Sequence, residues 1–280
     1  MVAGVLTVGD IEHIQLAAQE QKPVHPFIRG LRKATLPAVM EYGCLRWSQP
    51  KLNLPELPEG IARSPLGAAL KEVRSDLGMR TDRATAAAWT RLDPRPYGFF
   101  VLKDESDLDS KGWKVFETVY NLSSAKVGFT HKTASHLSTA LHEMAANAAT
   151  HADSPIPALI GFHVANGLSL FSVADVGIGV FASLRKHPAY AGVDTHAKAI
   201  RLALHDGVSS IAPDQRGWGF REVFKAILSC DGLRRFRSVG CCIEMTGADL
   251  DADRGTESFP PQVAGFQVSV CCRLRAPKPG

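Results

Sequence analysis

The chain has 280 residues, of which 45% are hydrophobic and 21% are charged. This composition excludes a largely disordered chain, and the length allows one large domain or two small ones. With 32 basic and 28 acidic residues the net charge is +4, which permits an anionic ligand but does not require nucleic acid.

The sequence carries no signal for a membrane or for export. Polar residues interrupt the most apolar stretch, 156–184, whereas a bilayer helix needs about 20 mostly apolar residues. The N-terminus lacks the basic and apolar segments of a signal peptide. The six cysteines form no C-x-x-C pair, so we expect free thiols, no zinc site and a cytoplasmic location.

The first 92 residues are predicted to be a mostly helical N-terminal region whose role the sequence does not reveal. A proline-rich segment at 48–60 is incompatible with both a helix and a central strand. Two prolines within 93–97 mark the boundary to a second domain, 93–280. The helices expected in the N-terminal region are 10–21, 26–42 and 65–92.

The second domain contains some segments with the apolar periodicity of a helix and others with the pattern of a strand. Asn166-Gly167, between two apolar runs, predicts a hairpin with a type I′ turn. No regular βαβ pattern appears, so we predict an α+β fold, a mostly antiparallel sheet with helices on one face. The expected strands are 98–103, 156–165, 168–174, 234–238, 241–245 and 265–274, and the expected helices are 109–126, 133–151, 195–205 and 222–228.

Three polar residues line the edge of the apolar stripe on the predicted helix 133–151. Glu143, Asn147 and His151 follow one another at intervals of four. An amide oxygen is a hard ligand that suits Mg²⁺, and a nearby carboxylate could act as a general base on a metal-associated water. An ordinary polar helix edge is the alternative interpretation.

Asp175 follows an apolar strand and precedes Gly177 and Gly179. A carboxylate buried at the end of a strand is costly without hydrogen-bond donors, and a purine exocyclic amine would supply one. The glycines would let the backbone approach a ligand closely. A common β-turn is the alternative.

A second glycine pair, Gly217 and Gly219, opens a predicted helix just after Arg216. The free N–H groups of a helix N-terminus bind phosphate readily, and an arginine adds a charge-assisted contact. A helix with a flexible entry is the alternative for this segment.

Taken together and in this order, the three segments resemble the ATP-binding Bergerat fold of the GHKL superfamily. Residues 142–151 resemble its N box, 175–179 its G1 box and 216–220 its G2 box. The resemblance covers about residues 97–275 and implies a two-layer α/β sandwich. Phe220 departs mildly from the aliphatic residue that is usual in the G2 box, and Gly265-Phe266 stands where the family commonly has Gly-Thr.

The resemblance implies a role for each candidate residue, with ATP and Mg²⁺ as the cofactors. Asn147 would hold Mg²⁺, and Glu143 would orient or activate the attacking water. Asp175 would accept a hydrogen bond from the adenine amine. The other implied contacts are Gly177 and Gly179 against adenine and ribose, Gly217, Gly219 and Arg216 around the phosphates, and 181–215 as the ATP lid.

These residues predict a Mg-dependent ATP-binding protein, an ATPase or protein phosphotransferase of the histidine-kinase-like class. The closest resemblance is to small stand-alone bacterial ATP-binding proteins such as the anti-sigma-factor serine kinases. We expect an unidentified protein partner or substrate, and a homodimer is compatible with the sequence. An ATP-gated regulatory module with little turnover, and a coincidental match in a structural protein, are the alternatives. We interpret the basic run 233–237 as a solvated strand face rather than a nucleic-acid contact.

Overall fold

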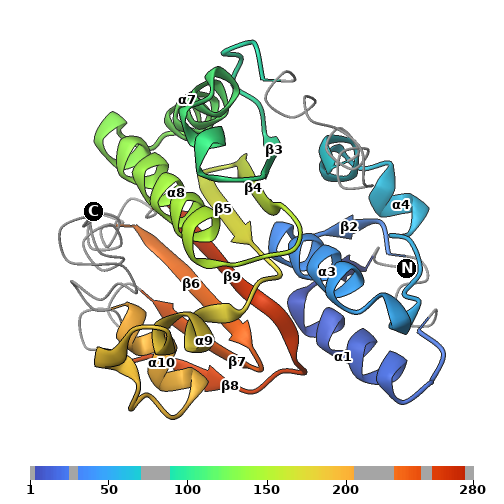
Figure 1. Ribbon diagram of the computed structural model, residues 1–280. Coiled ribbons are helices and arrows are strands. Elements are labelled where there is room, and N and C mark those ends of the chain that lie inside the picture. The colour runs from blue at the N-terminus through green and yellow to red at the C-terminus, as the bar shows by residue number, and fades with distance from the viewer. Residues whose placement is uncertain (1–3, 25–30, 71–88, 205–229, 247–253, 275–280) are drawn as a thin grey trace, which may run out of the picture.

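The computed structural model describes residues 4–24, 31–70, 89–204, 230–246 and 254–274 (Figure 1). Its centre is a seven-stranded antiparallel sheet with the strand order β3-β4-β5-β9-β6-β7-β8. Helices pack against this sheet, so the predicted α+β class is confirmed. The strands are β3 (Tyr97–Leu102), β4 (Ala158–Ala165), β5 (Leu168–Ala174), β6 (Asp231–Val239), β7 (Cys241–Thr246), β8 (Thr256–Ser258) and β9 (Val263–Arg273).

The hairpin between β4 and β5 forms as its turn sequence predicts. Asn166 has φ 49° and Gly167 has φ 70°, so both central residues adopt the positive φ that a type I′ turn requires. The register pairs Phe162 with Phe171 across the hairpin, and both rings are fully buried.

One face of the sheet is covered by α7 (Lys111–Lys126) and α8 (His131–His151), which follow a short 3-10 helix, η2 (Glu105–Asp109). Each long helix begins at a hydroxyl cap: Ser110 accepts from the backbone N–H of Trp113 at 3.0 Å, and Thr130 accepts from that of Thr133 at 3.1 Å. The predicted apolar stripe of α8 is buried against the sheet; its members are Leu137, Leu141, Met144 and Ala148.

The opposite face is covered by the N-terminal region, through α1 (Val8–Gln19) and α3 (Leu36–Ser48) (Figure 1). Phe100 and Leu102 of β3 pack toward α7 and α8, whereas Phe99 and Val101 belong to the N-terminal core. The sheet therefore lies between two helical layers: α7 and α8 cover one face, as predicted for residues 93–280, and the N-terminal region, whose packing the sequence left open, covers the other. The unbroken apolar run of β3 is the pattern of a strand buried on both faces.

The remaining N-terminal elements are short. They include a parallel pair of strands, β1 (Val5–Leu6) and β2 (Lys33–Ala34), the 3-10 helix η1 (Pro50–Leu52) and α4 (Glu59–Ala62), and residues 65–70 are helical as well. The helix predicted at 26–42 begins only at Leu36, because β2 precedes it and Thr35 caps it. Residues 25–30 and 71–88, on which parts of two predicted helices fall, lie outside the described residues.

A third helical group packs beside β6, β7 and β9 (Figure 1). It consists of α9 (Gly179–Arg185), the 3-10 helix η3 (Pro188–Tyr190) and α10 (His196–Ala203). Arg201 of α10 forms an ion pair with Glu257 of β8 at 2.7 Å, which fixes α10 to the edge of the sheet. The helix predicted at 222–228 lies outside the described residues.

The basic run 233–237 is not a solvated face, so that interpretation is wrong. Arg235 and Arg237 are buried and point their guanidinium groups at Glu41 of α3, which is only 3% exposed. Arg235 also contacts Glu12 of α1 and Glu244 of β7, each at 3.1 Å. The side chains of this run therefore join the N-terminal helices to the sheet.

The cysteines match their prediction: all six are free, five are buried and Cys271 is partly exposed. Within the described part of the chain, every helix is too short or too polar to span a lipid bilayer.

Candidate functional site

The polar edge predicted on α8 is present and only partly buried. Glu143 and Asn147 are partly exposed, whereas Met144 and Ala148 beside them are buried. The side-chain amide of Asn147 donates to the backbone carbonyl of Glu143 at 2.8 Å. This bond engages the amide nitrogen of Asn147 within the helix.

Glu143 occupies an environment that favours its neutral form. Burial raises the pKa of its carboxyl group, and the neighbouring His142 opposes this effect. A carboxylate with a raised pKa is a stronger base than an exposed glutamate, which is the property that proton abstraction from a water requires.

Asp175 lies one residue beyond the end of β5 and is only 4% exposed. Its Oδ1 atom accepts two backbone hydrogen bonds, from Gly177 at 2.8 Å and from Phe266 at 3.2 Å. Burial raises the pKa of Asp175 to about 6, although the two backbone bonds partly oppose this shift. Among the described residues, no group donates a hydrogen bond to the Oδ2 atom.

Gly177 and Gly179 are required by contacts within the chain itself. A Cβ atom at Gly177 would lie 1.8 Å from the carbonyl oxygen of Ala152, the C-cap of α8. Gly179 has φ +74°, and its Cβ would lie 2.9 Å from the hydroxyl of Ser238 at the end of β6. The loop after β5 is therefore held between the end of α8 and β6, which brings the first two predicted segments next to each other.

Gly265 and Phe266 complete the surroundings of Asp175, and the sequence did not assign them a role. Gly265 has φ +90°, and a Cβ there would lie 2.0 Å from the backbone oxygen of Asp175. This close approach lets the Phe266 N–H reach the carboxylate. The signal in the sequence was Gly265 itself, because any residue other than proline that follows it carries a backbone N–H.

The third predicted segment cannot be compared with this geometry. Arg216, Gly217 and Gly219 lie outside the described residues, as does the part of the predicted lid after residue 204. The described part of that lid is the α9–α10 group, which packs on the sheet and on a small apolar cluster of its own.

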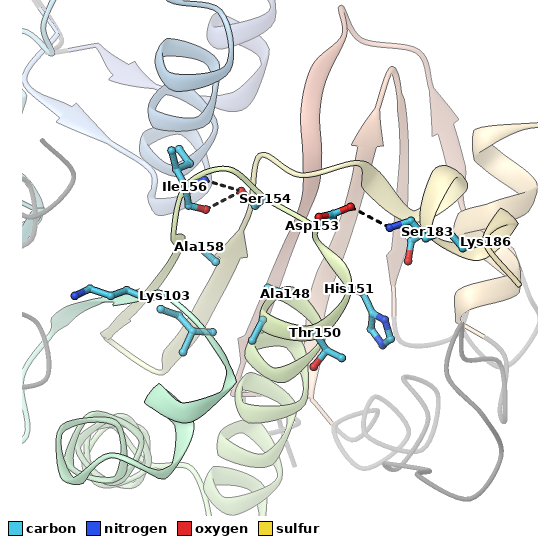
Figure 2. A pocket seen from close by; sticks show the side chains of 12 residues that line it. Lys103, Ala148, Thr150, His151, Asp153, Ser154, Ile156, Ala158, Ser183 and Lys186 are labelled. Atoms are coloured by element: carbon cyan, nitrogen blue, oxygen red, sulfur yellow. Dashed lines mark hydrogen bonds and ion pairs between the residues drawn. The ribbon is translucent and has the colours of Figure 1, made fainter. Parts of the chain in front are cut away.

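A pocket of about 520 Å³ opens beside the last turn of α8 (Figure 2). It is bounded by the end of β3, the turn before β4 and α9, where Lys186 and Asp153 form an ion pair at 3.0 Å. His151 lines this pocket, but Glu143, Asn147 and Asp175 do not. Among the described residues, no cluster of three or more acidic, histidine or cysteine side chains could hold a metal ion.

Comparison of the chain with known protein families and with curated proteins found no match.

Proposed function

We propose that the chain is a Mg-dependent adenine-nucleotide-binding protein of the GHKL class, with a Bergerat fold over about residues 97–275. The nucleotide would bind between the polar edge of α8 and the loop after β5. The adenine would contact Asp175, and Asn147 would contribute to the Mg²⁺ site. Turnover through Glu143, as an ATPase or a protein phosphotransferase, and the existence of a protein partner are parts of the same proposal.

The observation that carries this proposal is that only one of the two carboxylate oxygens of Asp175 accepts hydrogen bonds from the described residues. A carboxylate that is 4% exposed loses most of its hydration, and this loss is costly unless donors replace the water. Two backbone N–H groups serve Oδ1, whereas no described residue serves Oδ2. An exocyclic amine of a bound base would donate to Oδ2.

Asn147 fits the requirements of Mg²⁺. Its amide nitrogen is engaged with the Glu143 carbonyl, so the hard carbonyl oxygen is the atom that it offers. Mg²⁺ commonly takes one or two protein oxygens and completes its shell with phosphate oxygens and water. Bound there, the ion would neutralise phosphate charge, while Glu143, one turn earlier, would orient a water or remove its proton.

Calorimetric titration of the full chain with ATP tests the proposal. We expect one site for ATP in the presence of Mg²⁺, with weaker binding of GTP and CTP. Replacing Asn147 with Ala should weaken binding about tenfold with Mg²⁺ present and much less in EDTA, because only the metal contact is lost. Asn121→Ala, on α7, is the matched control and should bind like the wild type.

Two results would contradict this assignment in different ways. Absence of ATP binding, or equal affinity for ATP, GTP and CTP, would refute the adenine site. ATP binding whose Mg²⁺ dependence is the same in Asn147→Ala and in the wild type would refute only the metal role.

A further inference from the structure

Two free thiols, Cys230 and Cys272, lie next to each other on one face of the sheet where β6 begins. In the register of β6 and β9, the residue directly opposite Cys272 is Gly232. A Cβ atom at Gly232 would lie 1.8 Å from the backbone oxygen of Cys271, so the two strands approach closely at this point. Because Gly232 has no side chain, Cys230, which directly precedes β6, reaches Cys272 diagonally, and the two thiols are hydrogen-bonded.

Both thiols belong to the core beneath α7 and α8. Cys272 is fully buried and Cys230 is 8% exposed, and both lie in the cluster that contains Phe236 and Val270. Cys271, the preceding residue of β9, lies on the opposite face and packs against the N-terminal region. The alternation of side chains along β9 therefore assigns Cys272, and not Cys271, to the pair.

A buried cation lies beside the two thiols. Arg234 is 1% exposed, and its guanidinium group interacts electrostatically with both sulfurs. A cation next to a thiol stabilises the thiolate, which is the form that reacts. The hydrogen bond with Cys230 and burial raise the pKa of the Cys272 thiol, so Cys272 keeps its proton and directs it at the other sulfur. Cys230, the more exposed sulfur, is therefore the one that reacts first.

We propose that Cys230 and Cys272 are a redox-active pair, which a peroxide converts reversibly into a disulfide between the start of β6 and β9. Such a bond requires two sulfurs that are already neighbours on one face, and the strand register and Gly232 provide this arrangement. Gly217 and Gly219 precede Cys230 in the sequence, so the bond would anchor to β9 the point at which that stretch of chain enters the sheet. The inference does not depend on nucleotide binding.

The oxidation takes place in two steps. The Cys230 sulfur attacks one peroxide oxygen, the O–O bond breaks, and the leaving hydroxide takes up the Cys230 proton, which gives a sulfenic acid and one water. The Cys272 sulfur then attacks the Cys230 sulfur, the S–O bond breaks, and the hydroxyl group leaves with the Cys272 proton as a second water. The two thiols lose two electrons and two protons, and the peroxide accepts them.

The experiment treats the full chain with hydrogen peroxide, alkylates the remaining thiols with N-ethylmaleimide and measures the intact mass. We expect the number of alkylated thiols to fall from six to four, because one pair is oxidised, and a reductant to restore all six. Peptide mapping without reduction should place the bond between the peptide that contains Cys230 and the one that contains Cys272.

Two variants and a matched control assign the residues. Cys230→Ser should keep all of its alkylatable thiols in peroxide, because the sulfur that reacts first is lost. Cys272→Ser removes the resolving thiol, so the sulfenic acid on Cys230 should persist and be trapped by dimedone. The matched control is Cys271→Ser, at the adjacent position on the opposite face, which should still lose two thiols.

Three results would overturn the inference. They are a folded wild type that keeps six alkylatable thiols in peroxide, a bond that maps to other cysteines or links two chains, and a Cys271→Ser variant that no longer forms the bond. Circular dichroism checks the fold of each variant. If a serine variant does not fold, the mass and the peptide map of the wild type decide the matter.

Discussion

Glu143 and Asn147 lie one turn apart on the partly exposed edge of α8, where the side-chain amide of Asn147 donates a hydrogen bond to the backbone carbonyl of Glu143. The sequence predicts this edge because helical spacing is a local property: four residues advance the chain by about one turn. It does not predict the direction of the Asn147 amide or the raised pKa of Glu143. Both depend on what packs around the helix.

Glu143→Gln tests whether this edge performs chemistry. If Glu143 activates a water, the variant should bind Mg-ATP as the wild type does and turn it over about 10²–10⁴-fold more slowly. Phosphate release measures turnover, and calorimetry measures binding. Glu59→Gln, at an exposed carboxylate on α4, is the control and should retain wild-type turnover.

The ATP-gated module makes the opposite prediction for the same measurement. The wild type would then bind ATP but show no hydrolysis or phosphotransfer under any partner condition, and Glu143→Gln would change nothing. That result would assign Glu143 to holding the helix or a bound water.

At the scale of elements, features set by local sequence signals could be predicted, whereas contacts between residues far apart in the sequence could not. The hairpin of β4 and β5 and the span of α8 could be predicted because turn chemistry and apolar periodicity act within a few residues. The basic run of β6 could not be interpreted from its own sequence. Its counter-charge, Glu41, is 196 residues away from Arg237, and no local pattern reveals that pairing.

The contact between α3 and β6 predicts a large cost for removing one charge. Glu41→Gln leaves Arg235 and Arg237 buried without their shared carboxylate, and breaking a buried pair costs about 3–5 kcal/mol in the free energy of unfolding. Urea denaturation measures this change. Glu59→Gln removes an exposed i,i+4 pair with Arg63, and its effect should stay within about 0.5 kcal/mol.

Equal stability of the two variants would contradict this account of the interface. It would mean that apolar packing alone holds α3 on the sheet, and that the arginines of β6 gain little from Glu41.

At the scale of the whole molecule, the two regions predicted from the sequence share one hydrophobic core. Val39 and Leu45 of α3 belong to the same cluster as Phe99 and Leu159 of the sheet. The boundary predicted near residue 93 therefore separates two stretches of sequence that pack on the same strands. Sequence patterns locate such a boundary by its prolines but do not show where the preceding helices pack.

This packing also places the N-terminal helices near the candidate site. The nearby Asp175 helps to raise the pKa of the Cys44 thiol on α3. Arg235 and Arg237 of β6 contact α3, whereas Ser238 on the same strand accepts a hydrogen bond from the N–H of Val180 at 3.0 Å. The same strand thus contacts α3 through one face and the start of α9 through the other.

The central claim is that adenine binds at Asp175, and a crystal structure of the full chain with Mg²⁺ and a non-hydrolysable ATP analogue tests it most directly. The quantity to measure is the distance between Asp175 Oδ2 and the exocyclic amine of adenine. The account predicts about 3 Å, a hydrogen bond, with Asn147 Oδ1 about 2.1 Å from Mg²⁺. Nucleotide bound elsewhere, for example in the pocket beside His151, with no base at Asp175, would contradict it.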